Sequence, residues 1–295
     1  MKIEDFLREN ACLIDEYLQH HFSPLSTTSS LVSPILYGVE GGKKIRASLT
    51  LATGLSYGVE KKHLLPVAGA IEMIHAFSLV HDDLPCMDND DFRRGKPSMH
   101  RAFGEATAVL VGDALLVEGL RLIVGNEELI KLFSEEKVLD MVNVILKALG
   151  IEGMVGGQVL DLEGEGREVR EEEVWEIYRK KTSSFLTASI LCGAIAGSAP
   201  PQEKETLKNF GILLGECFQI KDDILDVTQK KEVLGKTPGK DKIQDKATLV
   251  KIKGVEESEK IMKSKWEEAV HLLSSIPRPF PFLLEIARFV IEREY

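Results

Sequence analysis

Residues 72–97 read EMIHAFSLVHDDLPCMDNDDFRRGKP, an apolar stretch that leads directly into a group of aspartates. Apolar residues recur through positions 64–81 at the 3.6-residue spacing of a helix. Residues 218–226, which read FQIKDDILD, repeat this design, because their aspartates also follow an apolar helical pattern. The sequence therefore predicts two helices that each carry a group of carboxylates.

Helical spacing extends well beyond these two stretches. It recurs over residues 3–18, 106–123, 138–149, 203–227 and 256–274. No proline lies between Pro97 and Pro200, which suits helices, and alternating strand patterns are scarce. A polar, lysine-rich loop is expected at 228–246. Because we find neither a linker nor a repeat of fixed period, we expect an all-α protein with a single domain over residues 1–295.

The composition excludes several classes of function. The 37 Lys and Arg residues against 47 Asp and Glu residues give a formal charge of −10, which argues against a nucleic-acid partner. The 44% of hydrophobic and 28% of charged residues are typical of a soluble globular protein. The four cysteines form no CxxC pair, so the sequence indicates neither a disulfide framework nor a zinc site.

The sequence also predicts a cytoplasmic protein without a membrane span. Residues 1–10 carry too many charges for the apolar core of a signal peptide. The longest uncharged stretch, residues 182–202, is rich in Ser and Thr and contains two prolines near its end. A membrane-spanning helix needs about 20 mostly apolar residues, so this stretch is a poor candidate.

The two aspartate groups indicate a metal and a phosphate. Asp222 and Asp226 are four residues apart, so a helix places both carboxylates on one face. Asp82 and Asp88 are six apart with Pro85 between them, so the helix is expected to end or bend there. One such group alone is equally typical of a solvated helix end. Two groups of like charges favour a bridging cation, and oxygen ligands favour Mg²⁺ bound together with a substrate phosphate.

Small basic groups provide contacts for phosphate. They are GGKKIR at 41–46, RRGK at 93–96, KKT at 180–182 and LGKTPGKD at 234–241. In the first, two glycines before a helix start can expose backbone N–H groups to an anion, and Lys43 and Arg46 are three residues apart. The last contains GKT, but a phosphate-binding P-loop would need a glycine where Lys230 stands.

A di-iron helical bundle is the competing metal hypothesis. Glu72 with His75, and Glu268 with His271, both have the E-x-x-H spacing that di-iron carboxylate proteins use. This hypothesis requires two further glutamates inside apolar helices and leaves both aspartate groups unexplained. His75 also lies seven residues before Asp82, which is two helical turns away on the same face.

The stretch 72–97 resembles the first aspartate-rich motif of the short-chain trans-isoprenyl diphosphate synthases, which are polyprenyl synthetases. Bacterial farnesyl diphosphate synthases, or geranyltranstransferases, are the most similar. Five further segments match in the same order over nearly the whole chain: GKKIR at 42–46, GGQVLD at 156–161, KT at 181–182, FQIKDDILD at 218–226 and GKTPGKD at 235–241. Two departures concern Lys44, where the family often has Arg, and Ala47, where it often has Pro.

The resemblance implies a fold, partners and residue roles. It implies an antiparallel helical bundle around a central active-site cavity, the isoprenoid synthase fold, usually as a homodimer. Three Mg²⁺ would be bound by Asp82, Asp88 and Asp222, with Asp83, Asp161, Asp223 and Asp226 nearby. The allylic diphosphate would contact Arg93, Lys181, Thr182, Gln219, Lys236 and Lys246, and isopentenyl diphosphate would contact Lys43, Arg46, His75 and Arg94. Among these, the residues closest to catalysis would be Asp82, Asp83, Asp88, Asp222, Lys181 and Lys236.

The implied reaction is a Mg²⁺-dependent prenyl transfer. Isopentenyl diphosphate would condense head to tail (1′-4) with dimethylallyl or geranyl diphosphate through an allylic carbocation. In the family, the fifth residue before the first aspartate sets product length, and here it is Phe77, which favours farnesyl diphosphate. The alternatives are a geranylgeranyl diphosphate synthase, an inactive regulatory subunit of this fold, and a terpene cyclase. The second aspartate group and the Lys43, Arg46 and His75 set favour a second diphosphate substrate over a cyclase.

Overall fold

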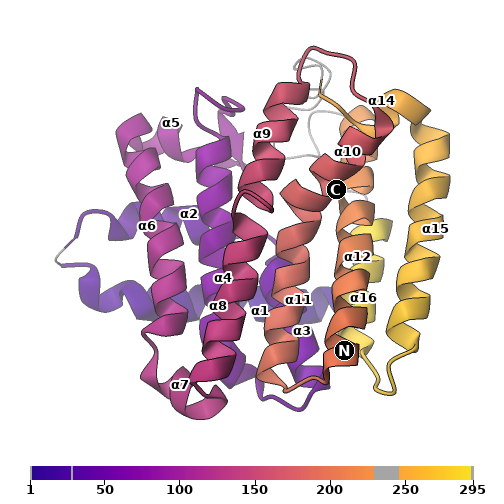
Figure 1. Cartoon of the computed structure of the whole chain (residues 1–295). Helices are drawn as coiled ribbons and strands as arrows, with labels where there is room; N and C mark the ends of the chain where they lie inside the picture. The colour runs from indigo at the N-terminus through magenta and orange to yellow at the C-terminus, as the bar shows by residue number, and fades with distance from the viewer. Residues whose placement is uncertain (1, 28, 229–245, 294–295) are drawn as a thin grey trace.

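The computed structural model describes residues 2–27, 29–228 and 246–293 (Figure 1). The α-helices are α1 (Ile3–Phe22), α2 (Val32–Val39), α3 (Ile45–Ser56), α4 (Lys61–Asp82), α5 (Met99–Phe103), α6 (Glu105–Val124), α7 (Glu127–Phe133), α8 (Glu135–Leu149), α9 (Met154–Gly164), α10 (Glu171–Ile177), α11 (Ser184–Ala196), α12 (Pro201–Thr228), α14 (Leu249–Lys253), α15 (Val255–Ser274) and α16 (Pro281–Glu292). A 3₁₀ turn, η1 (Ser23–Leu25), follows α1, and a π-helical turn, η2 (Tyr178–Ser183), joins α10 to α11.

The expectation of an all-α fold is confirmed. Over the described part of the chain, the strands are limited to the two-residue pair β1 (Phe92–Arg93) and β2 (Lys96–Pro97), which form an antiparallel hairpin. The helices predicted at residues 3–18, 64–81, 106–123, 138–149, 203–227 and 256–274 correspond to α1, α4, α6, α8, α12 and α15. The predicted polar loop falls almost entirely on residues 229–245, outside the described residues.

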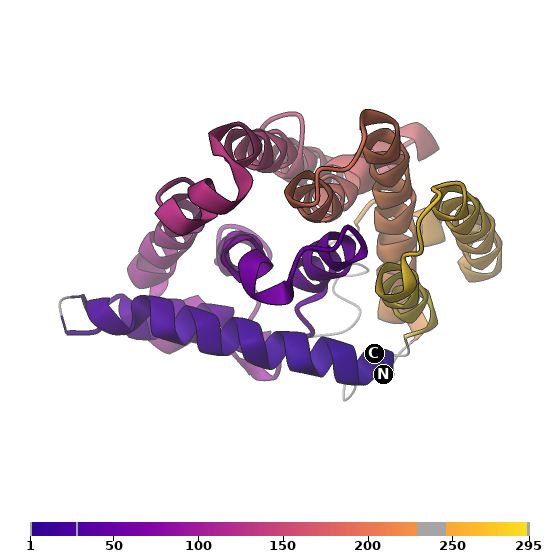
Figure 2. The same ribbon diagram turned by 90° about the horizontal axis from the view of Figure 1, so that it is seen from below.

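Helix α4 is the centre of the bundle. In the view along the bundle, α3 and α4 lie in the middle, with α1 across one side and other helices around them (Figure 2). Within the described residues, α4 alone is long and apolar enough to cross a membrane, but 61% of its most apolar window is buried inside the protein. The uncharged stretch 182–202 also lies in the core, as α11, packed against α3, α8 and α12. Both apolar stretches are therefore core helices here.

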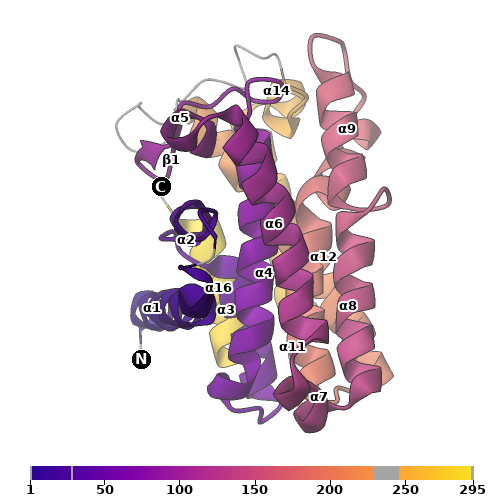
Figure 3. The same cartoon turned by 90° about the vertical axis from the view of Figure 1, so that its left-hand side faces the viewer.

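The upper end of the bundle holds the elements that carry the aspartate motifs. Helix α4 ends there, and the hairpin, α5, α9 and α14 gather at the same end (Figure 3). The largest apolar cluster of the core includes α4, whose Leu64, Ile71 and Ile74 are fully buried. A rigid packed body therefore supports the motifs at one end.

Helices α3 and α11 approach each other closely at a glycine. A Cβ atom on Gly193 would lie 2.4 Å from the carbonyl oxygen of Thr50 and 2.8 Å from the backbone nitrogen of Gly54. Thr50 Oγ1 also donates to the carbonyl of Ser189 at 2.8 Å. Because the nearest atoms belong to backbone, no side-chain rotation can make room for a methyl group.

We expect Gly193→Ala to destabilise the protein by about 2 kcal/mol, the usual cost of overpacking a core. The melting temperature measured by circular dichroism tests this. Gly164→Ala is the matched control, since a Cβ there would meet its nearest neighbour, Ala247 Cβ, at an ordinary 3.4 Å. Equal melting temperatures for the two variants would show that α3 can move away from α11.

Candidate active site

The chain reverses direction directly after the first aspartate of α4. The helix ends at Asp82, and the backbone N–H of Asp88 donates to the carbonyl of Asp82 at 2.8 Å. Asn89 takes a left-handed φ of 51° and its N–H bonds to Leu84 at 3.0 Å. The predicted break at Pro85 is confirmed, and the tight turn returns Asp88 to the helix end that carries Asp82.

A π-helical turn presents Lys181 to this helix end. A Cβ on Gly157 would lie 2.3 Å from the backbone nitrogen of Lys181, so α9 can approach the turn only with glycine there. Lys181 Nζ then lies 2.6 Å from Asp161 Oδ2. Burial lowers the pKa of Lys181, but Asp161 and Asp82 outweigh it and hold the pKa above its ordinary range. Lys181 therefore carries a full charge among the carboxylates.

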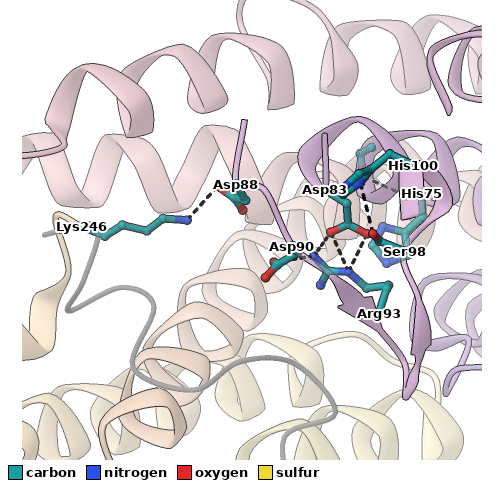
Figure 4. Close-up of polar contacts among 9 residues, drawn as sticks. His75, Asp83, Asp88, Asp90, Arg93, Ser98, His100 and Lys246 are labelled. Atoms are coloured by element: carbon teal, nitrogen blue, oxygen red, sulfur yellow. Dashed lines mark hydrogen bonds and ion pairs between the residues drawn. The ribbon is translucent and has the colours of Figure 1, made fainter. Parts of the chain in front are cut away.

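Lys246 bridges the first motif and α9. Its Nζ lies 3.3 Å from Asp88 Oδ1 and 4.0 Å from Asp161 Oδ2 (Figure 4). Burial raises the pKa of Asp82 above its ordinary value, against the opposing effect of Lys181, and the nearby Asp88 adds to the rise. The carboxylates thus repel one another, and lysines partly compensate them in the structure.

Helix α12 supplies the second group of carboxylates. Gln219 accepts a hydrogen bond from Thr182 Oγ1 at 2.7 Å and donates to Asp223 Oδ1 at 2.9 Å. Asp226 is buried, and its Oδ2 has no hydrogen-bond partner within the described residues. Asp222 Oδ1 accepts from Arg293 Nη2 at 2.5 Å. The second motif therefore carries oxygen atoms with capacity for a further ligand.

Two adjoining cavities open between these elements. One is a polar cleft of about 210 Å³, and the other is a larger cavity of about 820 Å³. Both are lined by Leu79, Asp82, Arg93, Lys181, Thr182, Gln219 and Asp222, and the polar cleft adds Asp88, Asp161, Asp223, Asp226 and Lys246. The structure thus brings together carboxylates and cations from three distant parts of the sequence.

One part of the larger cavity, the cation pocket, is rich in basic side chains. It is lined by Lys43, Arg46, His75, Arg94 and Arg293. Gly41 and Gly42 have left-handed φ values of 76° and 78°, and a Cβ on Gly42 would lie 2.8 Å from Arg94 Nε. Gly42 therefore makes room for the Arg94 side chain. Lys44 also lines the larger cavity, and its ammonium pairs with Asp15 at 3.1 Å.

Arg46 and His75 form the buried part of this pocket. Burial lowers the pKa of Arg46 to about 10, which leaves it charged at neutral pH. Burial and the nearby Arg46 and Arg94 hold the pKa of His75 well below its ordinary range, so His75 is neutral. Its Nε2 lies 3.1 Å from Arg46 Nη1 and accepts that hydrogen bond. Glu72 fixes the start of α3, which carries Arg46, because its Oε1 accepts from the backbone N–H of Ala47 at 3.1 Å.

Asp83 is the predicted metal ligand that the structure places elsewhere. Its carboxylate is 2% exposed and accepts two hydrogen bonds from Arg93 Nε, at 3.0 and 3.2 Å, and a further bond from Nη2 (Figure 4). Asp90 adds a contact to Arg93 at 3.3 Å. Asp83 lines neither the polar cleft nor the larger cavity. Because the helix ends between Asp82 and Asp83, the two neighbours face different partners, and Asp83 orients Arg93.

The apolar part of the larger cavity lies beside Phe77. Phe77 lines it and contacts the His81 ring edge-on, with the ring centroids 5.0 Å apart. His81 Nε2 lies 3.1 Å from the carbonyl oxygen of Val109 on α6. The other aliphatic walls come from α9, namely Met154, Val155, Val159 and Leu162. The cavity thus joins charged sites to an apolar chamber.

Arg293 is a residue of the site that the sequence did not predict, and the predicted Lys236 lies outside the described residues. Arg293 is a lone basic residue near the end of the sequence, far from every motif, and reaches Asp222 only through tertiary packing. The only sequence signal for it is the amphipathic pattern of the helix before it, which packs against α12. Lys236 lies among residues 229–245, which the structure does not describe.

The di-iron hypothesis is wrong. Glu72 and His75 lie on the buried helix α4, where they contact Ala47 and Arg46, whereas Glu268 and His271 are exposed on α15. The two E-x-x-H pairs therefore do not face one site.

Oxygen donors dominate the polar cleft, which fits a hard cation such as Mg²⁺. Within the described residues, no group of three His, Cys, Asp or Glu side chains is closed enough to hold an ion alone. Asp82, Asp88 and Asp222 would therefore bind such a cation only with further oxygens from water and a bound anion. Mg²⁺ is usually bound in this way, by one or two carboxylates, waters and substrate phosphates.

Comparison with known sequences agrees with this geometry. The sequence model of the polyprenyl synthetase family matches residues 28–274. The chain belongs to this family. It is a prenyltransferase by that membership, and its fold is the isoprenoid synthase fold.

Three relatives of this polyprenyl synthetase show how far the similarity extends. The farnesyl diphosphate synthase of Bacillus subtilis (strain 168) is 40% identical over 100% of this chain and 99% of its own length. The large subunit 1 of a heterodimeric geranylgeranyl pyrophosphate synthase from Arabidopsis thaliana is 42% identical over 86% of this chain and 69% of its own length. A Helicobacter pylori geranyltransferase, solved with magnesium and isoprenyl diphosphate, is 30% identical, with a TM-score of 0.84 over 99% of this chain and 97% of its own.

The neutral state of His75 in this polyprenyl synthetase predicts a pH dependence of stability. Its folded pKa lies below the ordinary value of 6.5, so only the unfolded chain gains a proton at this residue as the pH first falls below 6.5. Stability is fully present above that pH and should fall below it, by up to about 1.4 kcal/mol per pH unit from this group.

His75→Gln keeps an acceptor for Arg46 but cannot be protonated. Between about pH 7 and about pH 5.5, its free energy of urea unfolding should fall by roughly 1 kcal/mol less than that of the wild type. An equal loss in the two proteins would show that His75 is protonated in the folded state as well.

Proposed function

We propose that this prenyltransferase makes farnesyl diphosphate. It condenses isopentenyl diphosphate head to tail (1′-4) with dimethylallyl diphosphate and then with geranyl diphosphate. The proposal rests on one observation. The polar cleft adjoins the larger cavity, which contains both the cation pocket and an apolar part beside Phe77. Two diphosphates and one growing apolar chain need such a combination of sites.

The allylic diphosphate binds at the polar cleft. Asp82, Asp88 and Asp222 would hold three Mg²⁺ with it, and Asp161, Asp223 and Asp226 line the same cleft. When bound, Mg²⁺ neutralises the negative charge that develops on the diphosphate as the carbon–oxygen bond breaks. The cationic groups of Arg93, Lys181 and Lys246 add to this stabilisation from fixed positions, and Thr182 and Gln219 orient the anion. Lys236, a further allylic contact by the family resemblance, lies outside the described residues.

Isopentenyl diphosphate binds in the cation pocket. Lys43, Arg46 and Arg94 contact its diphosphate, and the structure supports Arg293 as a further cation of the same pocket. His75 is neutral, so it can share hydrogen bonds with Arg46 without adding a charge to an already cationic pocket. Because this diphosphate stays attached to the product, the pocket holds it without any need for bond cleavage.

The carbon–carbon bond forms in the apolar part of the cavity. Loss of diphosphate leaves an allylic carbocation, which the double bond of isopentenyl diphosphate attacks while aliphatic walls exclude water. Loss of a proton to the departing diphosphate completes the reaction. The walls formed by Met154, Val155 and Val159 carry no group that could take up this proton, which supports the diphosphate as the base.

We also propose that the enzyme is a cytoplasmic homodimer. Large aliphatic side chains are exposed along α6 and α8: Leu110, Val117, Leu139 and Leu146. An exposed apolar surface of this kind is typical of a protein–protein interface. A second copy would cover it with the same side chains.

The first test is incubation of the purified enzyme with labelled isopentenyl diphosphate and dimethylallyl, geranyl or farnesyl diphosphate, with and without Mg²⁺. We expect Mg²⁺-dependent formation of a fifteen-carbon product, read by chromatography. A twenty-carbon product would keep the reaction but establish a geranylgeranyl diphosphate synthase. No condensation with any starter would favour an inactive subunit or a cyclase.

Asp82→Ala and Asp222→Ala should each lower kcat/KM roughly 10³-fold, because each loses several kcal/mol of transition-state stabilisation and tenfold in rate is about 1.4 kcal/mol. Asp140→Ala, which removes an exposed carboxylate on α8, should leave kcat/KM unchanged. Ordinary Mg²⁺-dependent turnover by either cleft variant would refute the assignment of the metal site.

Phe77→Ala should lengthen the product, because it removes a ring from the wall of the apolar chamber. We expect the twenty-carbon fraction to rise at the expense of the fifteen-carbon fraction in the same assay. Phe133→Ala removes a buried ring from the same core without touching the cavity and should change stability only. An unchanged product distribution for Phe77→Ala would remove Phe77 from the control of chain length.

A further inference from the structure

We propose that Tyr178 is a positioning residue that fixes the segment 246–249 against the second aspartate group, so that Lys246 reaches Asp88 and Asp161. The inference rests on the proposed function, since it concerns how the allylic site is assembled. Tyr178 lines the polar cleft, and in this scheme it acts through Lys246 and Asp223 rather than on the substrate.

The hydroxyl of Tyr178 joins two elements that are far apart in the sequence. Tyr178 begins the π-helical turn and is buried, with its ring edge-on to Trp175 at 5.7 Å between centroids. Its O–H donates to Asp223 Oδ2, and its oxygen accepts from the backbone N–H of Leu249 at 2.8 Å. One hydroxyl therefore links α12 to the start of α14.

The bond to Leu249 controls where Lys246 stands. Leu249 is fully buried, Ala247 is nearly so, and Thr248 caps α14 by accepting from Lys251 N at 3.1 Å. Only two residues separate Leu249 from Lys246, so a fixed Leu249 leaves the Lys246 backbone little freedom. From that position Lys246 Nζ lies 3.3 Å from Asp88 and 4.0 Å from Asp161.

The other bond orients the second aspartate group. Asp223 Oδ1 accepts from Gln219, and Oδ2 accepts from Tyr178, so each carboxylate oxygen has its own donor. This carboxylate is buried, and a missing donor would leave it partly unsatisfied. Tyr178 thereby links both aspartate groups, the second directly and the first through Lys246.

The isopentenyl pocket is separate from this network. Its buried residues bond elsewhere: Arg46 and His75 bond to each other at 3.1 Å, and Arg94 donates to the carbonyl of Glu40 at 3.2 Å. Loss of the Tyr178 hydroxyl should therefore weaken the allylic site selectively. A merely structural role would affect both substrates alike.

The test is Tyr178→Phe, which keeps the ring packing and removes both hydrogen bonds. We expect the KM for geranyl diphosphate and the Mg²⁺ concentration at half-maximal rate to rise roughly three- to tenfold, as loss of about one hydrogen bond's net free energy predicts. The KM for isopentenyl diphosphate should change less than twofold. Calorimetry with Mg²⁺ and inorganic pyrophosphate, without turnover, should show a similarly weakened binding.

Tyr57→Phe is the matched control. Tyr57 also donates to a carboxylate, Glu203 Oε2 at 2.6 Å, but lines neither the polar cleft nor the larger cavity. It should lower the melting temperature without changing either KM or pyrophosphate binding. If Tyr178→Phe behaves like Tyr57→Phe, or raises both KM values equally, the inference is overturned.

A double-mutant cycle with Lys246→Gln tests the route through Lys246. We expect the double variant to lose less affinity for geranyl diphosphate than the two single losses add up to, because part of the effect of Tyr178 passes through that lysine. Fully additive losses would overturn the inference. If the wild type condenses no starter, the proposed function fails, and pyrophosphate calorimetry decides on Tyr178 alone: weakened binding supports its role and unchanged binding overturns it.

Discussion

Repulsion between carboxylates is the constraint on which the rest of this structure depends. Aspartates from α4, α9 and α12 converge on one cleft, where burial raises the pKa of Asp82. The protein compensates them with cations from distant parts of the chain, including Lys181, Lys246 and Arg293. The packed helices below the cleft contribute the free energy of folding that offsets this repulsion. The cleft is thus prepared to exchange protein contacts for metal ions and a diphosphate.

The division of charge within the cavity explains why two diphosphates can be treated differently. The polar cleft contains both carboxylates and cationic side chains. It therefore binds an anion only together with metal ions, and it can stabilise a leaving group. The pocket around Arg46 contains cations with a neutral His75 and holds an anion directly. The two sites open into the same apolar chamber, where the reacting carbon atoms can meet away from water.

The sequence predicts the helices and most of the site because those signals are local. Helical periodicity located α4, α6, α8, α12 and α15, and the proline at Pro85 predicted the end of α4. Local spacing does not say which way a side chain faces after a helix ends, so Asp83 was grouped with Asp82 although it binds Arg93. Arg293 and the Tyr178 hydroxyl act only through tertiary contacts, which no local pattern encodes. The E-x-x-H pairs show that a matching local spacing can also mislead, because the pairs on α4 and α15 do not face one another.

The π-helical turn at Tyr178–Ser183 makes this part of the chain intolerant of changes in length. Such a turn holds one residue more than an α-helical turn would, and each residue of an α-helix advances the next by about 100°. Deleting one residue there would rotate all of α11 about its axis, so that Gly193 would no longer face the backbone of α3. Natural variants and circularly permuted or shortened enzymes should therefore accept substitutions in this turn far more readily than insertions or deletions.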